Sequence, residues 1–220
     1  MHDDEPVGHL FSRREVVALL GVAGVAWLTH GTGNAATPSA PACVVRPQQT
    51  EGPFFVDGDL NRSDIRDGKG GTPLALALTI SRLNKDRCEP LPDAQVDLWH
   101  CDAAGVYSGV GDRESFLRGY QATDDRGAAR FVTIYPGWYP GRTVHIHFKV
   151  RANKYEFTSQ LYFDDAMTDR VHAAARYSAA ARRTRNDSDG IFRRGGEQLQ
   201  LEAIKSAGML RASFAMAMQF

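Results

Sequence analysis

The residues with the clearest capacity for chemistry lie close together in residues 135–148, YPGWYPGRTVHIHF. His145 and His147 are two residues apart, and residues at this spacing project from the same face of a β-strand. Two neighbouring imidazoles offer two nitrogen ligands, which suit iron, zinc or copper. The tripeptide alone is weak support for a metal site, because paired strand histidines often simply face solvent.

Tyrosine and arginine side chains nearby strengthen the metal hypothesis. Tyr139 lies in a loop punctuated by Pro and Gly that leads into the predicted strand, and such loops more often aim side chains than fill cores. Arg142 precedes His145 by three residues and brings a permanent positive charge to the same region. Tyr107 offers a second phenol oxygen after a small-residue turn, although by itself it is more typical of an ordinary half-buried tyrosine.

Short β-strands must position these side chains. Apolar patterns bounded by turn residues predict strands at residues 74–80, 94–99, 129–134, 144–152, 157–162, 199–204 and 210–218. Residues 167–181 include an Ala-rich run and form the only predicted helix. Strands at this turn-rich spacing indicate an all-β fold, an antiparallel β-sandwich or barrel with a short C-terminal helical segment.

The first 36 residues have the pattern of an export signal. Arg13-Arg14 precedes residues 16–28, an uncharged run that is shorter than the roughly 20 residues of a membrane span. The arginine pair resembles a twin-arginine signal, a route that exports folded proteins, whereas the alternative is a short N-terminal helix with solvated arginines. We therefore expect a leader at 1–36, a single catalytic domain at 37–220, and a periplasmic or extracellular bacterial protein.

Charge and cysteine content narrow the partners and the environment. Lys and Arg number 26 and Asp and Glu number 26, so no net field would attract nucleic acid or anionic lipid. An oxidising compartment permits one disulfide among the three cysteines. Cys43 and Cys88 flank the first predicted strands and are the favoured pair, although spacing alone leaves Cys101 open as a partner.

Five separated motifs together resemble the intradiol ring-cleavage dioxygenases, a family that includes catechol 1,2-dioxygenases and protocatechuate 3,4-dioxygenases. In chain order they are Glu51-Gly52-Pro53-Phe54, Trp99 to Tyr107, Tyr139-Pro140, Arg142-x-x-His145-x-His147 and Thr158-Ser159-Gln160-Leu161-Tyr162-Phe163. The resemblance covers residues 43–163 and is closest to exported, twin-arginine-signalled members. It implies an intradiol-type β-sandwich, with the first motif leading to the active site.

The resemblance also implies one non-haem ferric ion per chain, held by Tyr107, Tyr139, His145 and His147. Phenolate is a hard anionic donor, and a trivalent cation can deprotonate a phenol despite its free pKa near 10. Arg142 would stabilise negative charge that develops on the substrate ring, and Tyr139 would act as a base. Gln160 matches a supporting glutamine of the family, although a glutamine at a strand edge on the surface fits the sequence nearly as well.

The implied reaction inserts both atoms of O2 into a catechol-type aromatic diol and opens the ring to a cis,cis-muconate-type product. The expected partners are the diol, O2 and the twin-arginine export machinery, and a homo-oligomer is compatible with the sequence. One alternative is a cupin-like oxygenase or hydrolase built on the histidine pair, but residues 148–155 lack the glutamate that it needs. The other is a non-enzymatic exported binding domain, which the intact ligand set disfavours.

Overall fold

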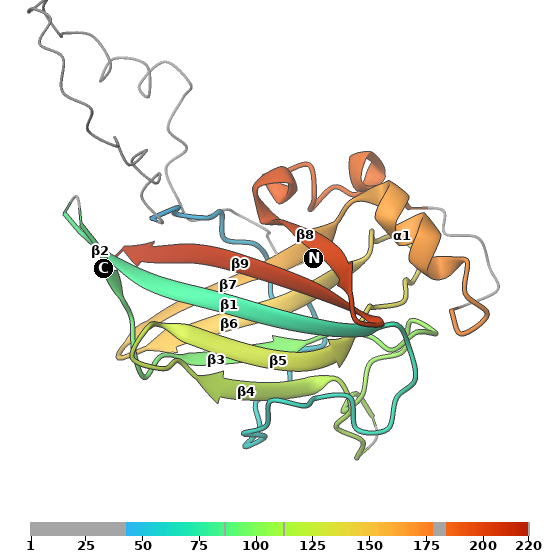
Figure 1. The fold of residues 1–220 in the computed structure, drawn as a ribbon, viewed down its shortest axis with the longest axis horizontal. Helices are drawn as coiled ribbons and strands as arrows, with labels where there is room; N and C mark the ends of the chain where they lie inside the picture. The colour runs from blue at the N-terminus through green and yellow to red at the C-terminus, as the bar shows by residue number, and fades with distance from the viewer. Residues whose placement is uncertain (1–42, 86, 112, 178–183, 220) are drawn as a thin grey trace, which may run out of the picture. The chain divides into compact units, whose positions relative to one another are not determined.

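The computed structural model describes residues 43–219, except 86, 112 and 178–183 (Figure 1). The regular elements of this part of the chain are mostly strands, which confirms the all-β prediction. They are β1 (Pro73–Asn84), β2 (Arg87–Pro90), β3 (Gln95–Trp99), β4 (Arg118–Ala122), β5 (Ala128–Ile134), β6 (His145–Ala152), β7 (Tyr155–Phe163), α1 (Asp165–His172), η2 (Asn186–Ser188), η3 (Gly196–Leu199), β8 (Gln200–Ser206) and β9 (Met209–Gln219). No helix among the described residues is long and apolar enough to cross a membrane.

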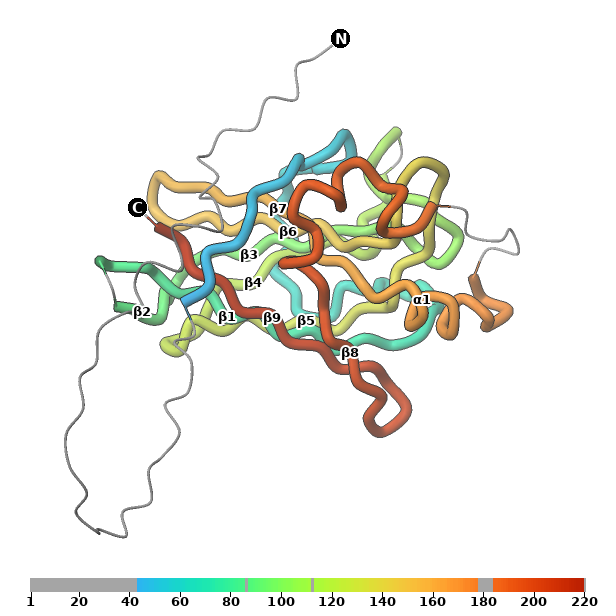
Figure 2. Tube along the Cα trace, turned by 90° about the horizontal axis from the view of Figure 1, so that it is seen from above, coloured from blue at the N-terminus to red at the C-terminus, as the bar shows by residue number. Residues whose placement is uncertain are grey.

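The strands form one curled sheet with the order β2-β1-β9-β8-β7-β6-β3-β4, and β5 pairs with β1 at residues 73–79, while β2 pairs with β1 at residues 81–84. Curling folds the sheet into two layers, with β1, β5 and β9 in the first and β3, β6 and β7 in the second (Figures 1 and 2). β8 connects the layers, because it pairs with β9 along most of its length and with β7 at Gln200 and Leu201.

The pairing is mixed, whereas the sequence predicted an antiparallel sheet. β1 pairs with β9 in parallel, and so does β7 with β8, while the other pairings are antiparallel. Turn residues indicate only how strands adjacent in sequence connect. They therefore do not predict that β1 pairs with β9, which lies more than 100 residues further along the chain. Strands β2 and β4 also escaped prediction, because RCEP and RGYQA lack an apolar pattern.

The hydrophobic core lies between the layers and fixes which residues face outward. Every second residue of β1 from Leu74 to Ile80 is buried in it, and Phe148 of β6 meets Phe214 of β9 at a ring-centroid distance of 5.9 Å. Because strand residues alternate between faces, His145 and His147 lie on the opposite side of β6 from Phe148. The second layer therefore presents both histidines on its outer face.

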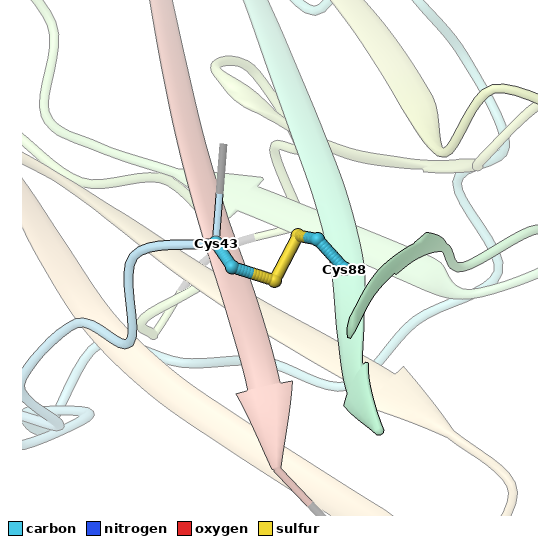
Figure 3. The surroundings of a disulfide bond; sticks show 2 residues. All are labelled: Cys43 and Cys88. Atoms are coloured by element: carbon cyan, nitrogen blue, oxygen red, sulfur yellow. A yellow bond between two sulfur atoms is a disulfide. The ribbon is translucent and has the colours of Figure 1, made fainter. Parts of the chain in front are cut away.

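Residues 43–54 form a crossing segment that covers that outer face. It pairs with β9 at Val45, and the Gln49 N–H donates to the carbonyl of Thr158 in β7 (Figure 2). Cys43 and Cys88, the favoured pair, form a disulfide that joins this segment to β2 (Figure 3). Cys101 is a buried free thiol that donates to the Gly137 carbonyl.

Helix α1 is shorter than the predicted 167–181. Asp164 caps its N-terminus by accepting a hydrogen bond from the Met167 N–H, and the helix ends at His172. Beyond it the chain turns back, because Tyr177 donates to the Tyr135 carbonyl and His172 lies 2.9 Å from the Pro136 carbonyl oxygen. Residues 178–181 of the predicted helix, like the leader at 1–36, lie outside the described residues.

Candidate metal centre

The two histidines of β6 bring their ring nitrogens together. Their Nε2 atoms lie 3.0 Å apart, and both side chains are buried. Nδ1 of His145 donates to the Thr143 carbonyl at 2.6 Å, which leaves the lone pair of Nε2 free to bind a cation. Burial is the main reason that the pKa of His145 falls to about 3 and that of His147 falls well below its ordinary value. Both imidazoles are therefore neutral at physiological pH, as metal ligation requires.

The ring of His147 is oriented by stacking on an indole. Among the described residues no partner reaches its buried Nδ1. The indole of Trp99, on the adjacent strand β3, stacks on the imidazole with a centroid distance of 5.0 Å and an interplanar angle of 10°. A flat indole against a flat imidazole restricts rotation of the ring, so Trp99 holds Nε2 of His147 toward its neighbour.

Two loops deliver Tyr107 and Tyr139 to the same point. The Tyr139 hydroxyl lies 3.3 Å from Nε2 of His145, and the Tyr107 hydroxyl lies 3.5 Å from it. The loops contact each other so closely that a Cβ on Gly105 would lie 2.3 Å from the Trp138 carbonyl oxygen. Gly105 also has a φ of +86°, a conformation that favours glycine, so its lack of a side chain sets the distance between the two tyrosines.

The phenols are poor anions unless a cation is present. Burial is the largest cause of the raised pKa of both groups, and the pKa of Tyr107 lies well above its ordinary value. A bound cation reverses this preference, because it stabilises the phenolate directly in the same low-dielectric surroundings. The tyrosines are therefore suited to a highly charged metal ion and poorly suited to ionise by themselves.

The spacing and chemistry of the four donor atoms fit a metal ion. Ligand atoms bonded to one ion at about 2 Å lie roughly 3 Å from one another, which is close to the separations described above. The part of the chain that the structure describes holds no group of three or more His, Cys, Asp or Glu side chains placed for a metal. Two nitrogens and two phenol oxygens are therefore the available donor set, and hard oxygen donors favour ferric iron over softer cations.

Arg142 and Gln160 lie beside the donor atoms. The Arg142 guanidinium donates through Nη2 to Oε1 of Gln160, and its Nη1 lies 3.5 Å from Nε2 of His145. Gln160 is fully buried on β7 and donates to the Thr50 carbonyl at 2.9 Å, so it is not a surface glutamine. All six residues singled out from the sequence thus meet in one place.

Comparison with known proteins identifies the family of this chain. A sequence model of the family described as Dioxygenase matches residues 50–193. A structure titled intradiol ring-cleavage dioxygenase, from Tetranychus urticae, superposes with a TM-score of 0.75 and 31% identity over 80% of this chain and 94% of that one. The chain belongs to the intradiol ring-cleavage dioxygenase family.

Relatives within the family differ in length and substrate. A chlorocatechol 1,2-dioxygenase of Pseudomonas putida is 32% identical over 69% of this chain and 64% of its own length. The dioxygenase domain of a carbohydrate-binding fusion protein from Streptomyces sp. SirexAA-E is 27% identical, with a TM-score of 0.63, over 80% of this chain and 98% of that one. The chain spans roughly half to two thirds of the length of the curated relatives that head the comparison.

The motif at residues 51–54 lies where the family resemblance placed it. A Cβ on Gly52 would lie 3.4 Å from Cε1 of His147, so the backbone passes directly over that ring. The Phe54 ring stacks on Tyr107 with a centroid distance of 4.3 Å. Lys149 forms an ion pair with Glu51 and holds the segment to β6. The crossing segment therefore forms one wall of the candidate metal centre.

Asp189 is the residue of this region that sequence reasoning missed. It lies in a polar stretch, RNDSDG, that resembles an ordinary solvated loop. In the structure its side chain is 1% exposed and forms an ion pair with Arg142 at 2.9 Å. No pattern in the sequence distinguishes this aspartate from its exposed neighbour Asp187, because the difference arises from a contact across 47 residues.

Proposed function

We propose that this chain is a ferric intradiol dioxygenase that opens the ring of a catechol-type aromatic diol with O2. The observation that carries the proposal is the convergence of one further imidazole nitrogen, Nε2 of His147, and two phenol oxygens within 3.5 Å of Nε2 of His145. The residues that would hold one ferric ion are Tyr107, Tyr139, His145 and His147. When bound, such an ion draws electron density from a chelated diol and prepares the ring carbon for reaction with O2.

Tyr139 is suited to accept a proton from the incoming diol. It is only half-buried, whereas Tyr107 is 7% exposed and is covered by the Phe54 ring. Without a bound cation beside it, the Tyr139 phenolate would have the high pKa that burial gives it, so it would take up a proton readily. We assign the base to Tyr139 and the permanent ligand to Tyr107.

Arg142 supplies positive charge where the substrate ring becomes electron-rich. Its Nη1 lies beside the donor atoms, and the guanidinium remains charged under all physiological conditions. Fixed charge in a water-poor site stabilises developing negative charge more strongly than solvent does. Trp99 and Phe54 exclude water from the two sides of the site that they cover. The product expected from cleavage between the hydroxylated carbons is a cis,cis-muconate-type diacid.

The test is the visible spectrum of the purified protein, together with its iron content, before and after anaerobic addition of catechol. Ferric iron bound to tyrosinate gives a broad visible band, and direct chelation by the diol moves that band to longer wavelength. Admission of O2 then gives oxygen uptake and a ring-opened acid. A colourless protein that contains stoichiometric zinc or no metal would contradict the proposal, because the scaffold would then lack the activity.

We further propose that the protein acts outside the cytoplasm and leaves it by the twin-arginine route. Arg13-Arg14 before an uncharged run supports the route, and a disulfide between Cys43 and Cys88 suits an oxidising compartment. Replacing Arg13 and Arg14 by lysine in the full chain is expected to leave the protein in the cytoplasmic fraction. Unchanged export of that variant would exclude the route.

A further inference from the structure

A buried carboxylate next to Arg142 is not used by the chemistry described so far. Asp189 follows η2 and is 1% exposed, and its Oδ2 accepts a hydrogen bond from Nε of Arg142 at 2.9 Å. A buried carboxylate is costly unless it is paired, so this contact carries a definite function in the fold or in the site. Asp189 either holds only its own loop in place or also orients the guanidinium of Arg142.

Two nitrogens of the Arg142 guanidinium are held by hydrogen bonds, and the third faces the candidate metal centre. Nε donates to Asp189, Nη2 donates to Gln160, and Nη1 lies 3.5 Å from Nε2 of His145. An arginine side chain has many rotamers, but a planar group anchored at Nε and Nη2 has one orientation left. Asp189 and Gln160 together therefore fix the direction in which Nη1 points.

Asp189 is itself rigidly held, which allows it to act as an anchor. Its Oδ2 also accepts from the Thr143 N–H at 2.8 Å, and its Oδ1 accepts from the backbone N–H groups of Ile191 and Phe192 at 2.7 and 3.2 Å. Burial would raise the pKa of this carboxyl, but Arg142 and the backbone donors outweigh it and hold the pKa below its usual range. The group is an ionised acceptor whose position is set by the main chain.

We propose that Asp189 is a positioning residue for ring cleavage, which orients the Arg142 guanidinium so that Nη1 faces the reacting ring. The kinetic part of this inference rests on the proposed dioxygenase function. Charge on Arg142 alone is not sufficient, because a misplacement of about 1 Å at a reacting centre can cost on the order of 100-fold in rate. A purely structural Asp189 would instead only pin its loop to Thr143.

A double-mutant cycle on the iron-loaded enzyme separates these possibilities. Asp189→Asn removes the charge and one acceptor, and we expect it to slow single-turnover ring opening by roughly 10- to 100-fold. In an Arg142→Ala background the same change is expected to alter the rate by less than about 2-fold, because the group that Asp189 orients is gone. Equal factors in the two backgrounds, or no effect in either, would overturn the proposal.

A control variant and a crystal structure distinguish a positioning role of Asp189 from a general effect of removing a carboxylate. Asp187→Asn, two residues away on an exposed side chain, is expected to keep the wild-type rate. Iron content and the visible band should be unchanged in Asp189→Asn, while its crystal structure should show Arg142 turned away from His145. If no diol is cleaved by the wild type, the proposed function fails, but an Arg142 that stays in place in this crystal structure would still refute the positioning role.

A second variant covers the case in which Asp189→Asn does not fold. Arg142→Lys leaves Asp189 bound to Thr143, Ile191 and Phe192, so the loop keeps its anchors. Lysine keeps the charge but lacks the planar fork that Asp189 and Gln160 orient together. We expect a loss of rate similar to that of Asp189→Asn, with the iron still bound. A rate near that of the wild type would show that orientation is unimportant and would refute the proposal.

Discussion

At the scale of single residues, the two tyrosines differ in how closely the protein surrounds them. Tyr107 lies under the Phe54 ring at a centroid distance of 4.3 Å, with an interplanar angle of 18°. Tyr139 meets the same ring edge-on at 6.0 Å and is only half-buried. One tyrosine is therefore held in place and the other has room to move, which is why the proposed roles are unequal.

Replacing Tyr139 by phenylalanine tests this assignment. The variant should keep its iron on the remaining three ligands, but the tyrosinate band should weaken and shift. We expect ring opening to slow by about 10²- to 10⁴-fold, because the variant lacks the proposed base. Tyr155→Phe, on the exposed start of β7, is the control and should leave the spectrum and the rate unchanged. An unchanged spectrum in Tyr139→Phe would mean that the ligand is wrongly assigned.

His100 gives the stability a defined pH dependence. Its Nδ1 donates to the Cys101 carbonyl at 2.8 Å and its Nε2 accepts from Thr133 at 2.6 Å, so the buried ring is neutral. Burial lowers its pKa from 6.5 to about 4. The unfolded chain binds the proton first, so His100 contributes stability fully above about pH 6.5 and loses it as the pH falls toward 4. The loss is up to about 3 kcal/mol.

The measurement is chemical denaturation of wild type and His100→Gln between pH 4 and 7.5. Glutamine can still donate to Cys101 and accept from Thr133, but it does not titrate. We expect the difference in unfolding free energy between the two proteins to shrink as the pH falls below 6.5. A difference that stays constant with pH would show that His100 does not titrate in this window.

At the scale of elements, loops rather than strands determine the distance between the tyrosines. Gly105 and Gly111 have almost the same φ, +86° and +85°. Only Gly105 is packed against another loop, since a Cβ there would meet the Trp138 carbonyl at 2.3 Å and one on Gly111 would meet nothing within 4 Å. Comparing substitutions at the two glycines therefore separates the stability lost through a left-handed backbone from the stability lost through a steric clash.

Alanine at each position should reveal the clash. Gly111→Ala should cost about 1 kcal/mol for its backbone conformation and leave the iron spectrum unchanged. Gly105→Ala should cost roughly 1–3 kcal/mol more and should weaken the tyrosinate band, because the two loops must move apart. Thermal unfolding and absorbance of the two iron-loaded variants provide the comparison. Equal losses would show that the loop contact does not hold the ligands.

Much of the fold and of the site follows from local sequence pattern. Strand alternation in β6 is enough to place His145 and His147 side by side, and apolar runs located seven of the nine strands. What the sequence did not reveal depends on contacts between distant segments. The pairing of β1 with β9, the burial of Asp189 and the stacking of Trp99 on His147 each join residues with no local signature.

At the scale of the whole molecule, the disulfide closes a long loop. Cys43 and Cys88 are 45 residues apart, and the bond ties the crossing segment to the edge strand β2. Closing a loop of this length removes conformational freedom mainly from the unfolded chain. The covalent bond therefore stabilises the wall of the site that the crossing segment forms.

Loss of the bond should lower the unfolding free energy by about 3–4 kcal/mol. The variant is Cys43→Ser combined with Cys88→Ser, measured by denaturant unfolding with and without a thiol reductant. Reductant should destabilise the wild type by a similar amount and leave the double variant unaffected. A wild type that is insensitive to reductant when unfolded would argue that the cysteines are not linked.

The parallel pairing of β1 with β9 also has a consequence for biosynthesis. Strand β6, with His145 and His147, leaves the ribosome long before β9, whose Phe214 packs against Phe148 on the opposite face of β6. The 56 residues between Ala152 of β6 and Met209 of β9 correspond to about 3 to 11 s of translation at roughly 5 to 20 residues per second. During that interval β1 and β5 of the first layer are already present, but β1 lacks its parallel partner β9 and Phe148 lacks its contact with Phe214, so the residues of the candidate site leave the ribosome before the core behind them is complete.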